Sequence, residues 1–147
     1  IIKECKFSIH DISRTEIDNN TNLPRFNMPL ELGIDIGIKK SSVPGYRNKQ
    51  ILIMDKEPFR YRNFISDIAG QDIKSHNNKE ETVIKSTREF LGNHYTNIAH
   101  GSVITKKYLE FKNQLPDLCT ASQWTINELS FNEFIFLANT WISLDKN

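Results

Sequence analysis

Hydrophobic and polar residues alternate strictly through residues 28–39, in the sequence MPLELGIDIGIK. Strict alternation is the pattern of a β-strand with one buried face. Plotted at about 100° per residue, the same stretch is also ordered as a helix. It then carries two apolar stripes, one stripe of small residues and one polar stripe: Met28/Leu32/Ile36, Leu30/Ile34/Ile38, Pro29/Gly33/Gly37 and Glu31/Asp35/Lys39.

We favour the helix over the strand for this stretch. A proline and two glycines are poorly suited to a central strand. Asn27 is a good N-cap, and Pro29 is tolerated in a first helical turn because the N–H it lacks would have no partner there. We expect this helix to be buried along both apolar stripes and to approach a neighbour closely along its glycines. Its polar edge would carry Glu31 near the helix start, a place that Glu31 loses if the stretch is a strand.

Two further apolar runs predict strands of a parallel sheet. Residues 6–12 (KFSIHDI) fit a short strand, and a loop rich in Asn, Asp and Thr follows it. Residues 50–55 (QILIMD) contain a continuous apolar run bounded by polar residues, as expected of a strand buried on both faces. Residues 59–67 predict a short helix or an ordered loop, and residues 68–73 break at a glycine before a short third strand.

From residue 79 onward the pattern changes to helices. Residues 80–91 have apolar positions at helical spacing, and residues 102–115 predict a second helix that ends at Pro116. Ser130 and Glu133 have the spacing of a capping box, in which each side chain satisfies a backbone N–H of the other residue. They predict the start of a last, strongly apolar helix.

The chain has 147 residues, a length suited to one domain with one core. We predict a single α/β domain over residues 1–147, with a sheet-containing core at 1–95 and a helical extension at 96–147. The chain starts with Ile1 rather than Met, in what resembles the end of a helix. We therefore expect a further portion to precede it.

The charge balance and composition exclude several classes of protein. With 19 basic and 18 acidic residues, the net charge of +1 produces no bulk field that attracts nucleic acid or membranes. The apolar runs are far shorter than the ~20 residues of a membrane-spanning helix, and residues 1–5 do not resemble a signal peptide. Cys5 and Cys119 form no CxxC motif, which argues against a metal site or a disulfide framework. We expect a cytoplasmic protein.

Polar side chains gather where the predicted strands end. In open α/β sheets this is the edge where ligands bind. Asp11, Ser13 and Arg14 follow the first strand and Asp55 ends the second. Arg14 and Arg25 could hold a phosphate by bidentate hydrogen bonds. The two acids are also explained as turn residues, and the two arginines as solvated loop residues.

Glu31 is the sharpest candidate for chemistry. A carboxylate near a helix start, at the ligand-binding edge, could act as a nucleophile or stabilise an oxocarbenium-like sugar. The simpler alternative is a surface acid that favours the positive end of a helix. Asn27 can cap the same helix and contact a ligand.

Other motifs are weaker. Aromatic residues and arginines interleave through residues 59–64, which could suit base stacking, but the balanced charge and the lack of a second basic patch make nucleic-acid binding unexpected. The four histidines have no metal-ligand spacing, and His10 is explained as a packed polar residue. No Walker loop, GxGxxG or GxSxG occurs, which leaves NTPase, dinucleotide-fold and hydrolase-triad functions without support.

These residues resemble a known superfamily. A strand ending in HDIS, an Asn/Pro loop, ELGI in a helix and the strand ILIM resemble the core of nucleoside 2-deoxyribosyltransferase-like and Toll/interleukin-1 receptor (TIR)-like proteins. The segments HDISR, LPRFNMPLELG and FISDIAGQDI are similar to uncharacterised bacterial TIR-like proteins, some of them linked to defence. The resemblance covers residues 1 to about 95. It places a strand–helix–strand before residue 1.

The resemblance implies a flavodoxin-like fold and cleavage of the N-glycosidic bond of a nucleoside, a nucleotide or NAD. The family's glutamate maps onto Glu31, and its strand-end acid and hydroxyl map onto Asp11 and Ser13. A small-molecule nucleotide or nucleoside would be the substrate, no cofactor is needed, and a homo-oligomer is expected. The loop over residues 14–26 departs from the family pattern. Two other hypotheses stay open: a nucleotide-sensing or self-associating module without turnover, and a defence-system scaffold with a vestigial pocket.

Overall fold

The computed structural model describes residues 1–19 and 22–144 and divides the chain into two compact units, Ile1–Ile98 and Ala99–Asn147. The described residues form a mixed α/β structure with one three-stranded parallel sheet and four α-helices. The sheet and the first two helices belong to the first unit, and the last two helices belong to the second.

The sheet consists of β1 (Phe7–Asp11), β2 (Gln50–Asp55) and β3 (Ile73–Ser75), in the order β1-β2-β3. Both pairs of neighbouring strands are parallel. The central strand β2 has the bounds that its apolar run predicts. The short third strand begins at Ile73, the last residue of the segment predicted to contain it, and extends beyond that segment to Ser75. Because the strands are parallel, all three carboxyl ends meet at one edge of the sheet.

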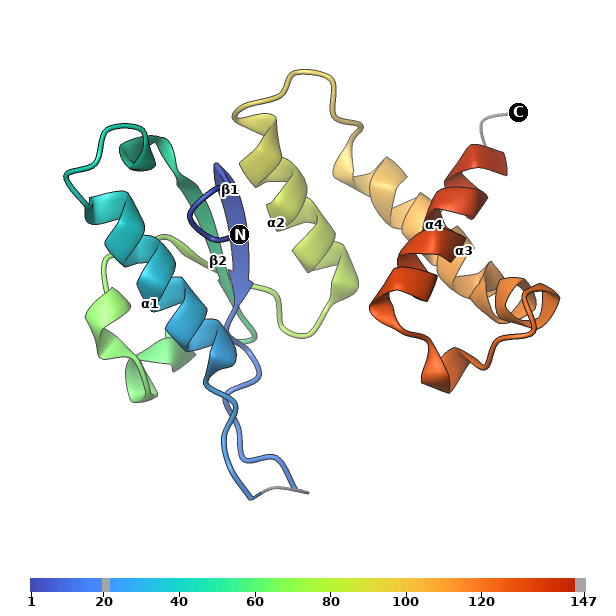
Figure 1. Cartoon of the computed structure of the whole chain (residues 1–147), viewed down its shortest axis with the longest axis horizontal. Helices are drawn as coiled ribbons and strands as arrows, with labels where there is room; N and C mark the ends of the chain where they lie inside the picture. The colour runs from blue at the N-terminus through green and yellow to red at the C-terminus, as the bar shows by residue number, and fades with distance from the viewer. Residues whose placement is uncertain (20–21, 145–147) are drawn as a thin grey trace. The chain divides into compact units, whose positions relative to one another are not determined.

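Helices cover both faces of this sheet, α1 (Asn27–Lys40) on one side and α2 (Glu80–Gly92) on the other (Figure 1). On the α1 side, Leu32 packs with Ile12 and Ile53 in a core that short 3-10 helices at residues 60–63 and 66–68 complete. On the other side, the ring of Phe7 in β1 meets Phe90 of α2 edge to face, with centroids 6.1 Å apart. Covering both faces explains why β2 is apolar from Ile51 to Met54.

The helical interpretation of residues 28–39 is confirmed, but the predicted orientation of the helix is wrong. Only one apolar stripe is buried, since Leu32 is 0% exposed whereas Leu30 and Ile34 are 66% and 47% exposed. Asp35, expected on the exposed polar edge, is also 0% exposed. The glycines approach no other element: no described atom outside the local helix backbone would lie within 4 Å of a methyl group added at Gly33 or Gly37. Polar partners of Asp35 on β1 and before β2 account for this rotation.

The predicted cap of α1 is also wrong. Asn27 is the first helical residue, Phe26 occupies the N-cap position, and no side chain bonds the first-turn N–H groups there. The backbone carbonyl of Phe26 accepts the N–H of Leu30 at 2.9 Å. Pro29 lies in the first turn, where the sequence places it.

The second unit is a pair of helices, α3 (Gly101–Ala121) and α4 (Phe131–Leu144). The capping box is confirmed: Ser130 N–H donates to Glu133 Oε2 at 2.7 Å, and Glu133 N–H donates to Ser130 Oγ at 3.3 Å. The predicted helix end at Pro116 is wrong, because α3 continues through it to Ala121. The continuation buries Cys119 against α4, in a core whose other buried members are Phe111, Leu115, Leu137 and Trp141.

Within the described residues, no helix has both the length and the apolar character needed to cross a membrane.

The open surroundings of the α1 glycines predict a stabilising substitution. Replacing Gly33 or Gly37 by Ala should raise the free energy of unfolding by about 0.5–1 kcal/mol each, because alanine restricts the unfolded chain and nothing described would clash with the added methyl group. Urea unfolding followed by circular dichroism measures the change. Gly45→Ala is the matched control and should lose stability, since Gly45 has φ +94°. A loss of stability in Gly33→Ala would show that another surface packs against this side of α1.

Candidate functional site at the carboxyl edge of the sheet

Polar side chains occupy the carboxyl ends of all three strands. Asp11 is the last residue of β1, Asp55 is the last residue of β2, and His76 directly follows β3. The backbone N–H of His76 still bonds the carbonyl of Asp55 at 3.0 Å, so the end of β3 stays attached to the end of β2. The structure therefore brings the predicted strand-end acids to one edge and adds a histidine.

Arg60 links the ends of β1 and β2. Its guanidinium donates to Asp55 Oδ1 from Nε at 2.8 Å and from Nη2 at 2.6 Å. The same group reaches the β1 end, where Nη2 donates to the carbonyls of Ile12 (2.9 Å) and Ser13 (3.0 Å) and Nη1 donates to Thr15 Oγ1 (3.1 Å). A single side chain thus fixes the loop that leaves β1.

This link changes the interpretation of Asp55, which the sequence suggests as a ligand-binding acid. Its side chain is 0% exposed, and its Oδ1 also accepts the backbone N–H of Lys56 at 2.7 Å. A ligand cannot reach this carboxylate in the observed conformation. Asp55 instead positions Arg60, and through it the carbonyl groups at the end of β1.

Asp11 remains accessible, with a side chain that is 43% exposed. Its Oδ1 accepts the backbone N–H of Ser13 at 3.0 Å and lies 3.4 Å from Nε2 of the buried His76. The Nδ1 atom of His76 accepts the backbone N–H of Asn78 at 3.1 Å. Since Nδ1 is an acceptor, the proton of the neutral imidazole lies on Nε2, facing Asp11. His76 thereby orients a carboxylate whose other oxygen can accept a hydroxyl group.

Arg14 and Arg25 are brought together around a pocket of about 240 Å³, whose other lining residues are Glu16, Ile17 and Asp18. Arg25 forms an ion pair with Asp18, with Nη2 and Oδ2 3.0 Å apart. Glu16 is hydrogen-bonded to Lys56, and this bond together with the lysine's charge lowers the pKa of Glu16 below its usual value. The volume is below the ~300 Å³ of small drug-sized ligand sites, and it suits a phosphate or sugar group better than a whole nucleotide.

Glu31 lies one helical turn before Asp35 and is half-buried. Because Asp35 contacts residues 8 and 10 of β1, and four helical residues rise about 6 Å, Glu31 is level with the carboxyl end of β1. In the described part of the chain, no hydrogen bond or ion pair engages its carboxylate. Asn27 is exposed at the start of the same helix.

Asp35 lies at the centre of a buried polar network that the sequence analysis missed. Its Oδ2 accepts the hydroxyl of Ser8 and lies 3.0 Å from Nε2 of His10, and its Oδ1 lies 3.0 Å from Nζ of Lys49. Lys49 is only 2% exposed, and its ammonium group also donates to the carbonyl of Ile2 at 2.7 Å. Burial on its own raises the pKa of Asp35, but the hydrogen bonds from Ser8, His10 and Lys49 outweigh it and leave the pKa below 3.8.

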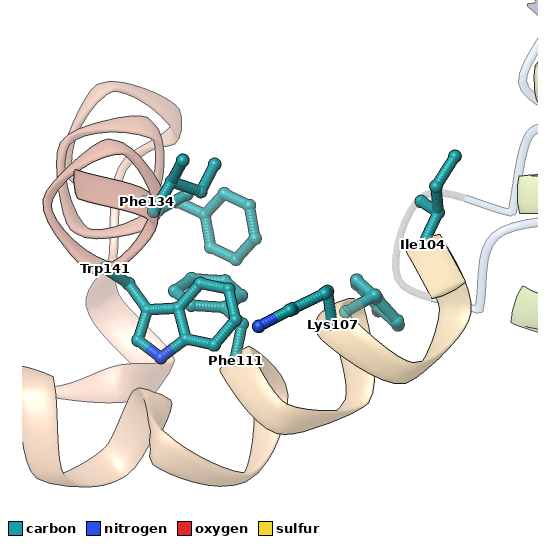
Figure 2. Close-up of a pocket in the computed structure, with 8 residues that line it drawn as sticks. Ile104, Lys107, Phe111, Phe134 and Trp141 are labelled. Carbon is teal, nitrogen blue, oxygen red and sulfur yellow. The ribbon is translucent and has the colours of Figure 1, made fainter. Parts of the chain in front are cut away.

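The helical unit holds a separate apolar groove of about 280 Å³ between α3 and α4, lined by Ile104, Lys107, Tyr108, Phe111, Phe134, Ala138, Trp141 and Ile142 (Figure 2). The ammonium group of Lys107 lies 5.9 Å from the centre of the Trp141 ring. No carboxylate lines this groove, and none of the site residues predicted from the sequence belongs to it.

Comparisons of the chain with protein-family models, with curated proteins and with solved structures find no match. Among the described residues, no three His, Cys, Asp or Glu side chains are grouped closely enough to hold a metal ion.

Sequence reasoning did not identify Arg60, His76 or Lys49 as parts of the site or its support. For Arg60 the sequence does contain a signal. It follows the strand-end acid Asp55 by five residues, a spacing at which a loop that returns to the sheet can bring the two side chains together. His76 and Lys49 had none, because their partners are 65 residues away in Asp11 and 14 residues away in Asp35.

The Asp35 network predicts a loss of stability in acid. A carboxyl group whose folded pKa is below its unfolded value stabilises the folded state fully above the unfolded pKa, near 3.8, and this contribution disappears as the pH falls through the folded pKa. Asp35→Asn should therefore be less stable at pH 7 and should lose less stability than the wild type between pH 5 and pH 2. Urea unfolding over this range gives the two slopes. Parallel slopes would contradict the assignment.

The Arg60 link predicts that its acid is needed for stability. Replacing Asp55 by Asn or Ala should lower the free energy of unfolding by about 3–5 kcal/mol, because the guanidinium of Arg60 then loses its counter-ion. The matched control is Asp18→Ala, which removes the partner of the exposed Arg25 and should change stability by about 0–1 kcal/mol. Equal effects in the two variants, measured by chemical denaturation, would contradict a structural role for Asp55.

Proposed function

We propose that residues 1–98 form a flavodoxin-like domain of the TIR or deoxyribosyltransferase type that cleaves the N-glycosidic bond of a nucleotide or of NAD. Glu31 acts at the glycosidic carbon, as a nucleophile or as the group that stabilises the oxocarbenium-like transition state. A parallel sheet covered on both faces, with polar residues at its carboxyl edge, supports this class of protein.

The observation that carries the proposal is the contrast between Glu31 and its acidic neighbours. Asp35 and Asp55 are fully buried in ion pairs, and Asp11 is bound by Ser13 and His76. Glu31 is half-buried at the level of the β1 end and is engaged by no described residue. A carboxylate that no described residue engages is available to a ligand.

The chemistry of NAD suits a site with one available carboxylate. When the bond between the ribose and the nicotinamide breaks, its electron pair neutralises the pyridinium nitrogen, and the base leaves without being protonated. Attack by the Glu31 carboxylate forms a glycosyl ester, which water then hydrolyses. The reaction needs no metal and no separate acid for the leaving group.

The remaining predicted residues would bind the substrate. The second oxygen of Asp11 and the hydroxyl of Ser13 are suited to ribose hydroxyl groups, and Arg14 and Arg25 to a phosphate. Asn27 lies at the start of the helix that carries Glu31. Asp55 acts indirectly, by holding Arg60.

A second candidate function is nucleotide sensing without turnover. The many hydrogen bonds of Arg60 favour this second function, because they make the carboxyl edge a rigid binding surface. In either case we propose a cytoplasmic homo-oligomer. The exposed stripe of α1 that contains Leu30 and Ile34 supports self-association, and sedimentation equilibrium that gives the mass of a monomer would contradict it.

The decisive experiment compares the wild type with Glu31→Gln. We expect the full 147-residue chain to release nicotinamide from NAD, and the substitution, which keeps the size and removes the charge, to lower the rate by at least about 100-fold. Chromatography of the products measures it, with AMP and deoxynucleosides as further substrates. Glu89→Gln, an exposed change on α2, is the control. Turnover that survives Glu31→Gln would exclude Glu31 as the reacting group, and thermal stabilisation by a nucleotide without product would favour sensing.

A further inference from the structure

Phe59 has a backbone conformation that is unusual for its type. Its φ and ψ are 61° and 2°, in the left-handed region. Of the other described non-glycine residues with positive φ, three are asparagine and one is glutamine: Asn22, Asn77, Asn78 and Gln123. Asparagine tolerates this region because its side chain bonds the local backbone, whereas a bulky aromatic residue there is strained. The chain needs a turn at this point, but it does not need a phenylalanine.

The fold gains little from this ring. Phe59 is 62% exposed and does not belong to the core that its neighbours Tyr61 and Phe64 help to form. Its contact is with Arg62, whose guanidinium carbon lies 4.6 Å from the ring centre. Strained residues that the surrounding structure holds in place are concentrated at ligand-binding sites.

The surrounding structure holds Phe59 at the carboxyl edge of the sheet. It follows Asp55, the end of β2, by four residues, and it precedes Arg60, which is tied to Asp55, Ser13 and Thr15. Since the guanidinium of Arg60 is bonded at this edge and the Cα atoms of Phe59 and Arg60 are only about 3.8 Å apart, the backbone of Phe59 stays close to the site.

We propose that the Phe59 ring, backed by the Arg62 guanidinium, is a stacking platform for the base of a mononucleotide held at this edge. Every base has a π-face that can stack on an aromatic ring, and the Arg62 guanidinium on the Phe59 ring adds a cation–π contribution. The proposal rests on the proposed function for the choice of ligand, and it assigns binding of the base to residues that the proposed function does not use. Phe59 and Arg62 touch the ligand without taking part in bond cleavage.

The test measures equilibrium binding of AMP and of ribose 5-phosphate by calorimetry, in the full chain carrying Glu31→Gln so that no turnover occurs. Phe59→Leu keeps an apolar side chain and removes the ring. It should weaken AMP binding by about 5- to 100-fold and leave ribose 5-phosphate, which has no base, within twofold. Arg62→Lys should also weaken AMP binding, because lysine keeps the charge and loses the planar stack. Phe131→Leu, an equally simple change at an exposed phenylalanine of α4, is the control.

Phe59→Asn separates a binding role from a structural one. If the strain exists for the ligand, asparagine should raise the midpoint temperature of unfolding and still lose AMP affinity. A lower midpoint, unchanged AMP affinity in Phe59→Leu, equal losses for AMP and ribose 5-phosphate, or no AMP binding before substitution would each overturn the platform. Binding of a six-residue oligoadenylate more than tenfold tighter than AMP would overturn the assignment to a mononucleotide. Base-dependent binding without any wild-type turnover would leave the platform standing and refute only the glycosidase.

Discussion

The ion pair between Asp35 and Lys49 fixes how α1 lies on the sheet, and the geometry of the site depends on it. Both side chains are buried, and removing two charges from water is expensive unless their geometry and further hydrogen bonds compensate. Here Ser8 and His10 of β1 satisfy Asp35, and the carbonyl of Ile2 satisfies Lys49. A rotation of α1 about its axis would leave these charges without partners. The helix is therefore held with Leu32 inward and Glu31 at the border of the buried face.

The Asp55–Arg60 ion pair fixes the position of the carboxyl edge, as the Asp35–Lys49 pair fixes the position of α1. It joins the end of β2 to Ile12 and Ser13, the residues that follow β1. Without this link, the polar loop that begins there would be less firmly attached to the sheet. A site needs positioned groups, and loops position groups only when something holds them. The four acids therefore have two different roles. Asp35 and Asp55 are fully buried and hold α1 and the loop after β1 in place, whereas Asp11 is accessible and Glu31 is half-buried without a described partner.

The parts of this structure that could be predicted are those set by local patterns. The strand at residues 50–55, the helix from residue 80 and the capping box at Ser130 depend on neighbours in sequence, and each is found where its pattern predicts it. The rotation of α1 could not be predicted, because a stripe of Glu31, Asp35 and Lys39 looks like a solvated edge until Lys49 and His10 are placed beside it. The helix across Pro116 was missed for a related reason. Burial of Cys119 against α4 outweighs the one backbone hydrogen bond that a proline removes.

The same distinction separates the predicted from the unpredicted residues at the site. Asp11, Ser13 and Asp55 were predicted as site residues because strand ends are visible in a sequence. The sequence could not show that Asp55 already forms an ion pair with Arg60. Burial distinguishes structural acids from candidate site acids, because a buried, ion-paired carboxylate already stabilises the fold and has no contact with solvent. Among the described residues, no hydrogen bond or ion pair engages the carboxylate of Glu31, and the strained ring of Phe59 lies outside the core. The ligand that we propose at the carboxyl edge of the sheet would account for both.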